Sequence, residues 1–431
     1  MTLSFLFLSV AYFAAGLTAL TSFLSSACAY LLLWLVIPSG FVFFEHLSYS
    51  GIHASDFYFL ALFPVYILLT LRKHFSLEVL SSLCVFCIML CCVYSIVYFL
   101  NDGSLDKYYL KDLRPFLHIL FFIIFILSSS TCKLCIQSST ITMIVAAGCL
   151  SNIIVFTLVT LGYVGVDDLY YSANAYRYFD ATSYISAIYL IITYGNWNYC
   201  KISPLQKAVV HVTAVLCILT VVASGMRILV IGLSAAVLFS GELNIQRALS
   251  SLFIVTVLIV GFLFTSYALQ IERITDYLSL SRIIEQIVVR FGPALNPISS
   301  MGANEVFVGQ GIATTFEIPW FAYRGLDTVH NTIDSTYLTF FVKYGIASIG
   351  VIYTFVHMFT VNANKNTRTG LIVLISALFL TTSFPYQHFS LPAIIFSYVY
   401  NSIFTISKRK GWRTGTGFPA VLCRGFRKVS G

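Results

Sequence analysis

The chain has 431 residues, of which 58% are hydrophobic and only 10% are charged, and its formal net charge at pH 7 is +8. Soluble domains are about 45–50% apolar and about 25% charged, so this composition excludes a soluble globular protein and a disordered chain. The basic residues are scattered over short loops and the C-terminal segment, which excludes a nucleic-acid-binding protein. We therefore predict an all-α polytopic membrane protein.

The first 44 residues contain no charged side chain, and no basic residue precedes Arg72. A secretory signal needs a basic first segment, so we expect these residues to be membrane-embedded sequence rather than a cleaved signal. A single helix of this length would extend about 66 Å, roughly twice the hydrocarbon core of a bilayer. We therefore expect two spans there.

The remaining apolar runs bring the expected total to about 12 or 13 spans, since each span needs about 20 residues. In chain order we expect spans at 3–20, 24–43, 56–72, 78–100, 113–130, 140–163, 181–198, 206–223, 227–241, 248–268, 346–361, 369–386 and 390–407. Lys and Arg are more frequent in one set of alternating loops and in the tail, so that side is expected to be cytoplasmic. The C-terminus is then inside, and the side of the N-terminus depends on the number of spans.

Four regions follow from this pattern. Residues 1–268 form an N-terminal transmembrane bundle, 345–407 form the C-terminal transmembrane helices, and 408–431 form a basic cytoplasmic tail. Between them, residues 269–344 form one large polar loop on the outer side. Long loops are usually functional or disordered; because this one contains amphipathic segments, we expect an ordered extracytoplasmic cap with short amphipathic helices.

Arg227 follows Ser224-Gly225-Met226 and precedes an apolar run that is too short to span a bilayer alone. The span must begin near Val221, which brings Arg227 into the outer membrane region. An arginine at that depth is costly unless it is paired or faces water. It either contacts an anionic lipid headgroup in a cavity or extends to the outer interface, and we favour the headgroup.

Residues 281–291 predict an amphipathic helix that ends at Gly292-Pro293. Arg282, Gln286 and Arg290 are four residues apart and share one face, while isoleucines and a valine occupy the other. Each guanidinium can bind phosphate oxygens through two donors, so two of them could bind a diphosphate. Alternatively, the helix lies on the membrane with Arg282 paired to Glu285.

His330-Asn331 precedes Asp334, and this spacing resembles a helix capping box in which Asp replaces the usual Glu. We expect the helix to start near Asn331 and to end at Tyr344, because Gly345 is a typical C-terminal signal. His330 would then lie at the start of the helix, where a neutral imidazole can accept a proton from a sugar hydroxyl. Asp327 and Asp334 are the competing bases.

Four weaker features complete the candidates. Gly309-Gln310-Gly311 suits a turn better than a phosphate loop. Arg177 lies among tyrosines that are typical of a membrane interface, and it is a candidate headgroup contact. Arg114-Pro115 begins a span, and we interpret Arg114 as an interface anchor. Cys132 and Cys135 form one C-x-x-C without a second pair or a nearby histidine, so we expect no metal and no redox site.

Several of these segments resemble a known family. Asp334-Ser335-Thr336-Tyr337-Leu338 and Lys343-Tyr344-Gly345-Ile346 resemble O-antigen polymerases (Wzy-like), and His330-Asn331 resembles the related O-antigen ligases. Ser224-Gly225-Met226-Arg227 is similar to a serine–arginine element that both families share. The resemblance in topology covers nearly the whole chain, but not every arginine motif of the polymerases is present in the outer loops.

The resemblance implies a metal-independent, inverting glycosyltransferase of lipopolysaccharide biosynthesis that needs no cofactor. It would join undecaprenyl-pyrophosphate-linked oligosaccharide units at the periplasmic face of a bacterial inner membrane. Arg227 and Arg290 would bind the diphosphate, and His330 would be the catalytic base. The substrate-binding residues would be Arg282, Arg177, Asn331, Asp334 and Tyr337. Its partners would be the carrier-linked substrate, membrane lipids and a chain-length regulator protein, but no nucleic acid.

Three other functions compete with a polymerase. A ligase would use the same chemistry and differ only in its acceptor. A flippase or transporter should have two similar halves and charged residues in several spans, whereas the charges here concentrate in one outer loop. A sensor with a ligand-binding cap is the weakest alternative.

Overall fold

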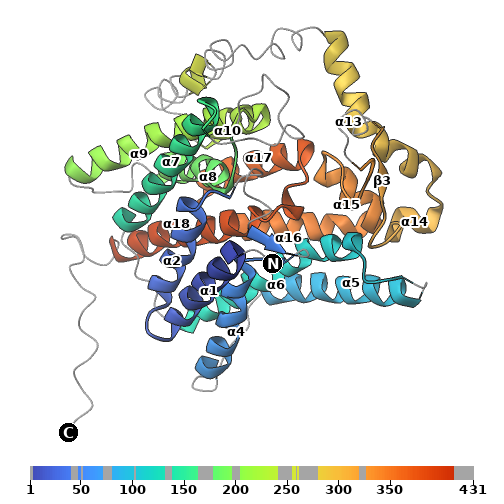
Figure 1. The fold of residues 1–431 in the computed structure, drawn as a ribbon, viewed down its shortest axis with the longest axis horizontal. Coiled ribbons are helices and arrows are strands. Elements are labelled where there is room, and N and C mark those ends of the chain that lie inside the picture. The colour runs from blue at the N-terminus through green and yellow to red at the C-terminus, as the bar shows by residue number, and fades with distance from the viewer. Residues whose placement is uncertain are drawn as a thin grey trace.

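Helices make up most of the structure, a computed structural model shown in Figure 1. It describes residues 3–39, 47–49, 52–70, 80–100, 103–131, 138–163, 178–196, 204–240, 255–258, 260–261, 280–319 and 327–411. The described residues are thus mostly helical, as predicted, although short strands accompany the helices. The expected span at 248–268 lies almost wholly outside them, as do Arg177, Cys132 and Cys135.

The described helices fall into an N-terminal and a C-terminal group along the chain. The helices of the N-terminal part are α1 (Leu3–Leu17), α2 (Phe23–Val36), α4 (Asp56–Thr70), α5 (Leu80–Leu100), α6 (Lys107–Thr131), α7 (Ser138–Thr160), α8 (Ala181–Asn196), α9 (Pro204–Ala223) and α10 (Arg227–Phe239). Those of the C-terminal part are α13 (Leu280–Ser300), α14 (Ala303–Val308), α15 (Thr336–Tyr344), α16 (Ser348–Thr360), α17 (Lys365–Thr381) and α18 (Ser390–Gly411). The 3-10 turns are η1 (Thr18–Leu20), η5 (Gly345–Ala347) and η6 (Phe384–Tyr386).

Two short antiparallel hairpins interrupt the helices. In the first, β1 (Ser48–Tyr49) pairs with β2 (Ile52–His53) before α4 begins. In the second, β3 (Phe316–Glu317) pairs with β4 (Val329–His330), so that Phe316 lies opposite His330. The second hairpin brings His330 close to residues that precede it by more than a dozen positions.

Four helical segments are long and apolar enough to cross a membrane: Leu3–Leu20, Ser139–Thr160, Pro204–Ala223 and Thr336–Thr360. Several shorter apolar helices accompany them. The two helices expected within the first 44 residues are present as α1 and α2, separated by η1. Ser22 caps α2 by accepting a hydrogen bond from the Ser25 backbone at 3.3 Å, which explains why the chain turns there.

Two predicted helix boundaries were wrong. The helix expected from Asn331 begins at Thr336, because Ser335 is the residue that caps it. Its predicted end at Tyr344 is confirmed. The other helix, α13, does not end at Gly292-Pro293 but continues to Ser300. In its second half, Ala294 packs in a small core with Phe316 and Val342. This packing outweighs the loss of the backbone hydrogen bond that Pro293 cannot donate.

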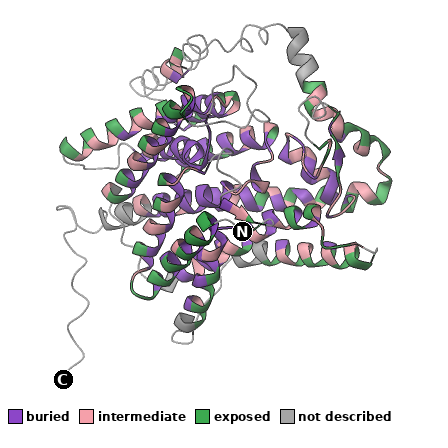
Figure 2. Cartoon of the chain, viewed as in Figure 1, coloured by how far each residue is buried: buried purple, intermediate pink, exposed green. Residues whose placement is uncertain are grey.

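The centre of the bundle is formed by helices that are buried along most of their length, above all α8 and α18 (Figure 2). Around them, α10 packs antiparallel along α17. Gly232 lies against Leu374 and Ala377, and Gly370 lies against Ala236 and Ser240. This register places the first residue of α10, Arg227, level with the last turn of α17.

Residues 280–344 supply a small second unit at one end of the bundle, which we call the cap (Figure 1). Its described elements are α13, α14, the β3–β4 hairpin and α15. They enclose their own core of Ala294, Phe316, Ile318, Ile333 and Val342. Of the loop expected at 269–344, residues 280–319 and 327–344 are therefore described and contain helices, while its extracytoplasmic side stays a prediction.

The cap joins the bundle through two glycines that a larger residue could not replace. Gly309 and Gly345 both have positive φ, at 73° and 53°. A Cβ at Gly309 would collide with the backbone of Lys343, and one at Gly345 would collide with the backbone of Val306 and Phe307. The end of α14 and the turn before α16 therefore meet backbone to backbone.

We expect Gly309→Ala to destabilise the purified protein more than Gly162→Ala. Both glycines have similar positive φ, 73° and 76°, but a Cβ at Gly162 meets nothing within 4 Å. The control should lose only about 1–2 kcal/mol of stability, because its alanine must adopt a left-handed backbone conformation. Gly309→Ala should lose more, because its Cβ also collides with the Lys343 backbone. Thermal unfolding in detergent measures both, and equal losses would contradict the close approach.

Candidate functional site

A buried charge cluster fastens the cap to α6, and we call it the cap anchor: Asp112, Asn331, Lys343 and the backbone N–H of Ala313. Lys343 forms an ion pair with Asp112, and both side chains are completely buried. Asn331 donates to the second carboxylate oxygen at 2.8 Å, and the Ala313 backbone donates to the first at 2.8 Å. Buried charges are tolerated only when paired and hydrogen-bonded, so the cap anchor fixes where the cap lies.

Asn331 therefore holds a position rather than capping a helix. Its amide is used by Asp112, while the capping role predicted for it belongs to Ser335. A second contact supports the same placement, since the Thr336 backbone and hydroxyl both donate to the Thr382 carbonyl, at 3.0 and 2.7 Å. The chain between β4 and α15 is thus hydrogen-bonded both to α6 and to the end of α17.

His330 lies next to the cap anchor, at the outer edge of β4. Three residues earlier, Asp327 accepts from Lys107 at 3.0 Å, from Tyr108 at 3.3 Å and from the Val329 backbone at 3.0 Å. Partial burial lowers the pKa of His330 below its ordinary value, and Lys111 and Lys107 lower it further. The imidazole is accordingly neutral at pH 7, and its Nε2 atom is buried.

Arg290 reaches the same region from α13. Its guanidinium lies 3.5 Å from a carboxylate oxygen of Asp334, and both side chains are about half exposed, at 48% and 41%. An exposed pair of this kind contributes at most about 1 kcal/mol, so a stronger anion could displace Asp334. Tyr337 lies three residues after Asp334, and its ring centroid is 5.9 Å from that of Phe379.

Arg227 begins α10 and is exposed. The turn before it is formed by Gly225, with a φ of 61°, and by Ser224, which accepts from the Met226 backbone at 3.2 Å. The packing of α10 on α17 puts Arg227 level with the end of α17, and Thr336 is bonded to that end. Arg227 and Arg290 therefore lie at the same end of the bundle, the end that carries the cap. Arg282 belongs to α13, but its side chain lies outside the described residues.

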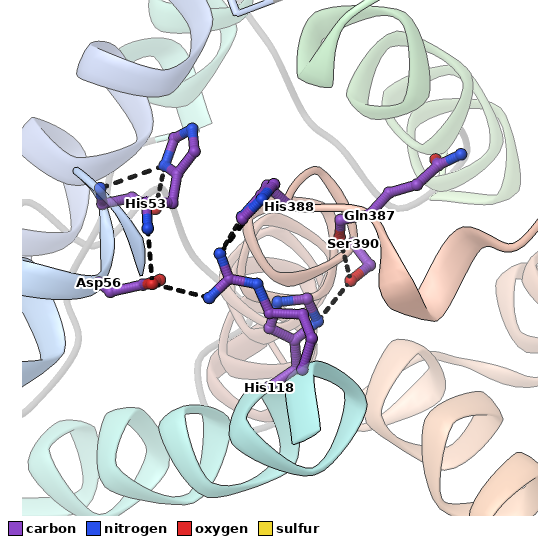
Figure 3. A network of polar contacts seen from close by, with 8 residues as sticks. His53, Asp56, His118, Gln387, His388 and Ser390 are labelled. Carbon is purple, nitrogen blue, oxygen red and sulfur yellow. Dashed lines mark hydrogen bonds and ion pairs between the residues drawn. The ribbon is translucent and has the colours of Figure 1, made fainter. Parts of the chain in front are cut away.

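A second buried polar group surrounds Arg114, two residues after Asp112 on α6. We call it the arginine–histidine cluster: His53, Asp56, Arg114, His118 and His388 (Figure 3). Arg114 is only 6% exposed and binds Asp56 at 2.7 Å. Its other terminal nitrogen contacts the ring of His388. Asp56 also accepts from the His53 backbone at 3.0 Å, so one carboxylate joins β2 to α6.

The histidines of this cluster extend it in two directions. His53 stacks on Trp34 of α2 with ring centroids 4.8 Å apart and lies 4.5 Å from His388. His118 contacts the Ser390 hydroxyl at 2.7 Å, and Ser390 donates to the Gln387 carbonyl at 3.0 Å (Figure 3). Side chains from α2, α4, α6 and the loop before α18 thus meet around one guanidinium.

The sequence analysis missed this cluster, and its interpretation of Arg114 as an interface anchor was wrong. The guanidinium points into the bundle, because a carboxylate and an imidazole from distant segments surround it. The available signal was the spacing of Arg114 and His118, which places both on one face of α6. A polar face on an apolar span is a functional hypothesis by default.

One further sequence feature, the glycine pair at residues 309–311, has a structural role. The expected turn at Gly309-Gln310-Gly311 is present, and its N–H groups donate to backbone carbonyls. Gln310 donates to the Val342 carbonyl at 2.8 Å and Gly311 to the Lys343 carbonyl at 2.9 Å. Among the described residues, no three histidine, cysteine or acidic side chains gather as metal ligands.

A family model described as "Family of unknown function (DUF6369)" matches residues 23–409. The match covers the bundle from α2 onward and the cap, including every residue of the cap anchor and of the arginine–histidine cluster. Comparisons with curated proteins and with solved structures give no match.

We expect Lys343→Met to destabilise the protein by about 3–5 kcal/mol, because it leaves the buried Asp112 carboxylate without its cation. Adding Asp112→Asn should restore much of this loss, since the amide oxygen still accepts from Asn331. Thermal unfolding in detergent measures the effect, with Lys365→Met on an exposed lysine as the matched control. A double variant less stable than Lys343→Met would refute the ion pair's role.

We expect the stability of the protein to fall as the pH is lowered below about 6.5. Burial and the neighbouring Arg114 lower the pKa of His53 and His388 well below the ordinary value of 6.5. Both imidazoles are neutral when folded and take up protons on unfolding, so stability is full above pH 6.5 and is lost below it. Each contributes up to about 1.4 kcal/mol per pH unit.

The measurement is the unfolding temperature between pH 7.5 and 5, compared with that of His388→Gln. This variant should show a smaller decrease, and His211→Gln, on the exposed face of α9, should behave like the unmodified protein. A decrease that is identical in all three proteins would show that the cluster is not its cause.

Proposed function

The chain belongs to the DUF6369 family, whose function is unknown, and we propose that it is a glycosyltransferase that joins polyprenyl-diphosphate-linked oligosaccharide units. The observation that carries this proposal is the position of His330. It is held beside the cap anchor as a neutral imidazole, at the end of the bundle where Arg227 and Arg290 also lie. A proton acceptor and phosphate-binding cations are the groups that this reaction requires.

In the proposed reaction, Arg290 exchanges its exposed partner Asp334 for the diphosphate of one carrier lipid, and Arg227 binds the same group. His330 removes the proton from a hydroxyl of the acceptor sugar. The hydroxyl oxygen then attacks the anomeric carbon while the bond from that carbon to the diphosphate oxygen breaks. The electron pair leaves with the diphosphate, whose charge the arginines stabilise, and the configuration at the carbon is inverted.

The contacts of the N-terminal helices support an arrangement with 13 spans. Phe5 of α1 packs against Tyr49 and Phe57, which flank the arginine–histidine cluster near the cap. The start of α1 is therefore at the cap end of the bundle. With the basic tail in the cytoplasm, the N-terminus and the cap are both periplasmic, and the enzyme lies in a bacterial inner membrane. A chain-length regulator is its expected partner protein.

Two alternatives remain in this proposal. A ligase would transfer the finished glycan to another lipid with the same residues. A transporter is favoured by a different observation, since the ion pairs Asp56–Arg114 and Asp112–Lys343 are buried at the ends of apolar helices. Buried ionisable groups of this kind line transport pathways in other membrane proteins.

We expect Arg290→Ala and Arg227→Ala to abolish chain growth in a deletion strain, at unchanged protein level. Loss of one group that stabilises the leaving charge costs about 10²–10³ in rate, and loss of the base in His330→Ala about 10²–10⁴. Arg290→Lys should lose most of the activity, because an ammonium cannot bind two oxygens side by side. Arg368→Ala, exposed at the other end of α17, is the control.

The products in the deletion strain distinguish the alternatives. Lipopolysaccharide that carries single units indicates a polymerase, whereas polymer that remains on the carrier indicates a ligase. Carrier-linked units that accumulate on the cytoplasmic face indicate a transporter. Full activity of His330→Ala would remove this residue as the base.

A further inference from the structure

The end of α14 exposes two large apolar side chains on the surface of the cap. Phe307 is 63% exposed and Val308 is 55% exposed. After Ala303, the first turn of the helix carries Asn304 and Glu305, so its polar residues lie before the apolar end. We call Phe307 and Val308 the tip of α14. Exposed apolar side chains that lie next to each other indicate a contact with something other than water.

The position of this tip relative to the bundle is fixed. The hydroxyl of Tyr94 on α5 donates to the Val308 carbonyl, and the Tyr94 ring packs on Tyr344 at 5.2 Å. On the other side, Gly345 is in backbone contact with Val306 and Phe307. The tip of α14 is therefore level with the second half of α5 and with the start of α16.

Both neighbouring helices expose apolar side chains at that level. On α5 the exposed residues next to Tyr94 are Val93, Ile96, Val97 and Leu100. They continue for six residues beyond Tyr94, about 9 Å along the helix axis. At the start of α16, Ile346 and Ile349 are exposed within a segment that is long and apolar enough to cross a membrane. Phe307 and Val308 thus join an apolar surface that belongs to these helices.

The backbone around the tip also suits a lipid environment. Irregular chain at membrane depth is tolerated only where its polar groups are satisfied within the protein. Gly309 donates to the Glu305 carbonyl at 2.6 Å, and Gln310 and Gly311 donate to Val342 and Lys343. The Val308 carbonyl accepts from Tyr94.

We infer that the tip of α14 is inserted among the lipid acyl chains on the cap side of the membrane, beside α5 and α16. The cap is then partly membrane-embedded rather than entirely in the aqueous phase. Its partner at this surface is lipid, and the polar end of α14 faces the headgroups. This inference does not depend on the proposed activity.

Photo-crosslinking in reconstituted vesicles tests it. The full-length protein, with benzoylphenylalanine in place of Phe307, is incorporated into phosphatidylcholine vesicles and irradiated. The mass of the protein is then measured by mass spectrometry. The same is done at Val308, in case the first variant does not fold. Val97 on α5 is the positive control. Val329 is the negative control, because it is also partly exposed, at 37%, but belongs to β4 beside Asp327 and Lys107.

We expect a mass gain of one phospholipid at positions 307, 308 and 97, and none at 329. A phospholipid adduct at 97 without one at 307 and 308 would overturn the inference. So would adducts at 307 and 308 to a second copy of the chain, because the tip would then be covered by protein.

Discussion

The structure depends on the cost of burying charge in an apolar medium. Lys343 and Asp112 are removed completely from water, and neither would be stable there without the other. Because one residue belongs to α15 and the other to α6, their pairing requires the cap to close on the bundle in one arrangement. Asn331 and Ala313 complete the hydrogen bonds of the carboxylate. The positions of His330 and Arg290 are consequences of this contact.

The helices themselves could be predicted from hydropathy, because an apolar run in a membrane protein must satisfy its backbone as a helix. Their boundaries were less predictable. Asn331 and Ser335 are both good capping residues, and only the contact of Asn331 with Asp112, 219 residues away, decides between them. Likewise Gly292-Pro293 would end an isolated helix, but the packing of Ala294 in the cap's core carries α13 onward.

The arginine–histidine cluster could not be predicted for a related reason. Arg114 next to a proline at the start of a span has the same local pattern as an arginine that anchors a helix at the interface. Its partner His388 is 274 residues away, and Asp56 follows a hairpin whose role is visible only in three dimensions. Candidates on the cap, such as Arg290 and His330, were easier to find because polar residues in a long loop stand out against an apolar chain.

The two buried clusters share one helix. Asp112 and Arg114 are two residues apart on α6, so their side chains leave the helix in nearly opposite directions, about 200° apart at 3.6 residues per turn. Asp112 holds the cap, and Arg114 holds α4 and the loop before α18. A rotation of α6 about its axis that separated Asp112 from Lys343 would also move Arg114 away from Asp56. The two ion pairs therefore fix the rotation of α6 about its own axis relative to both the cap and α4.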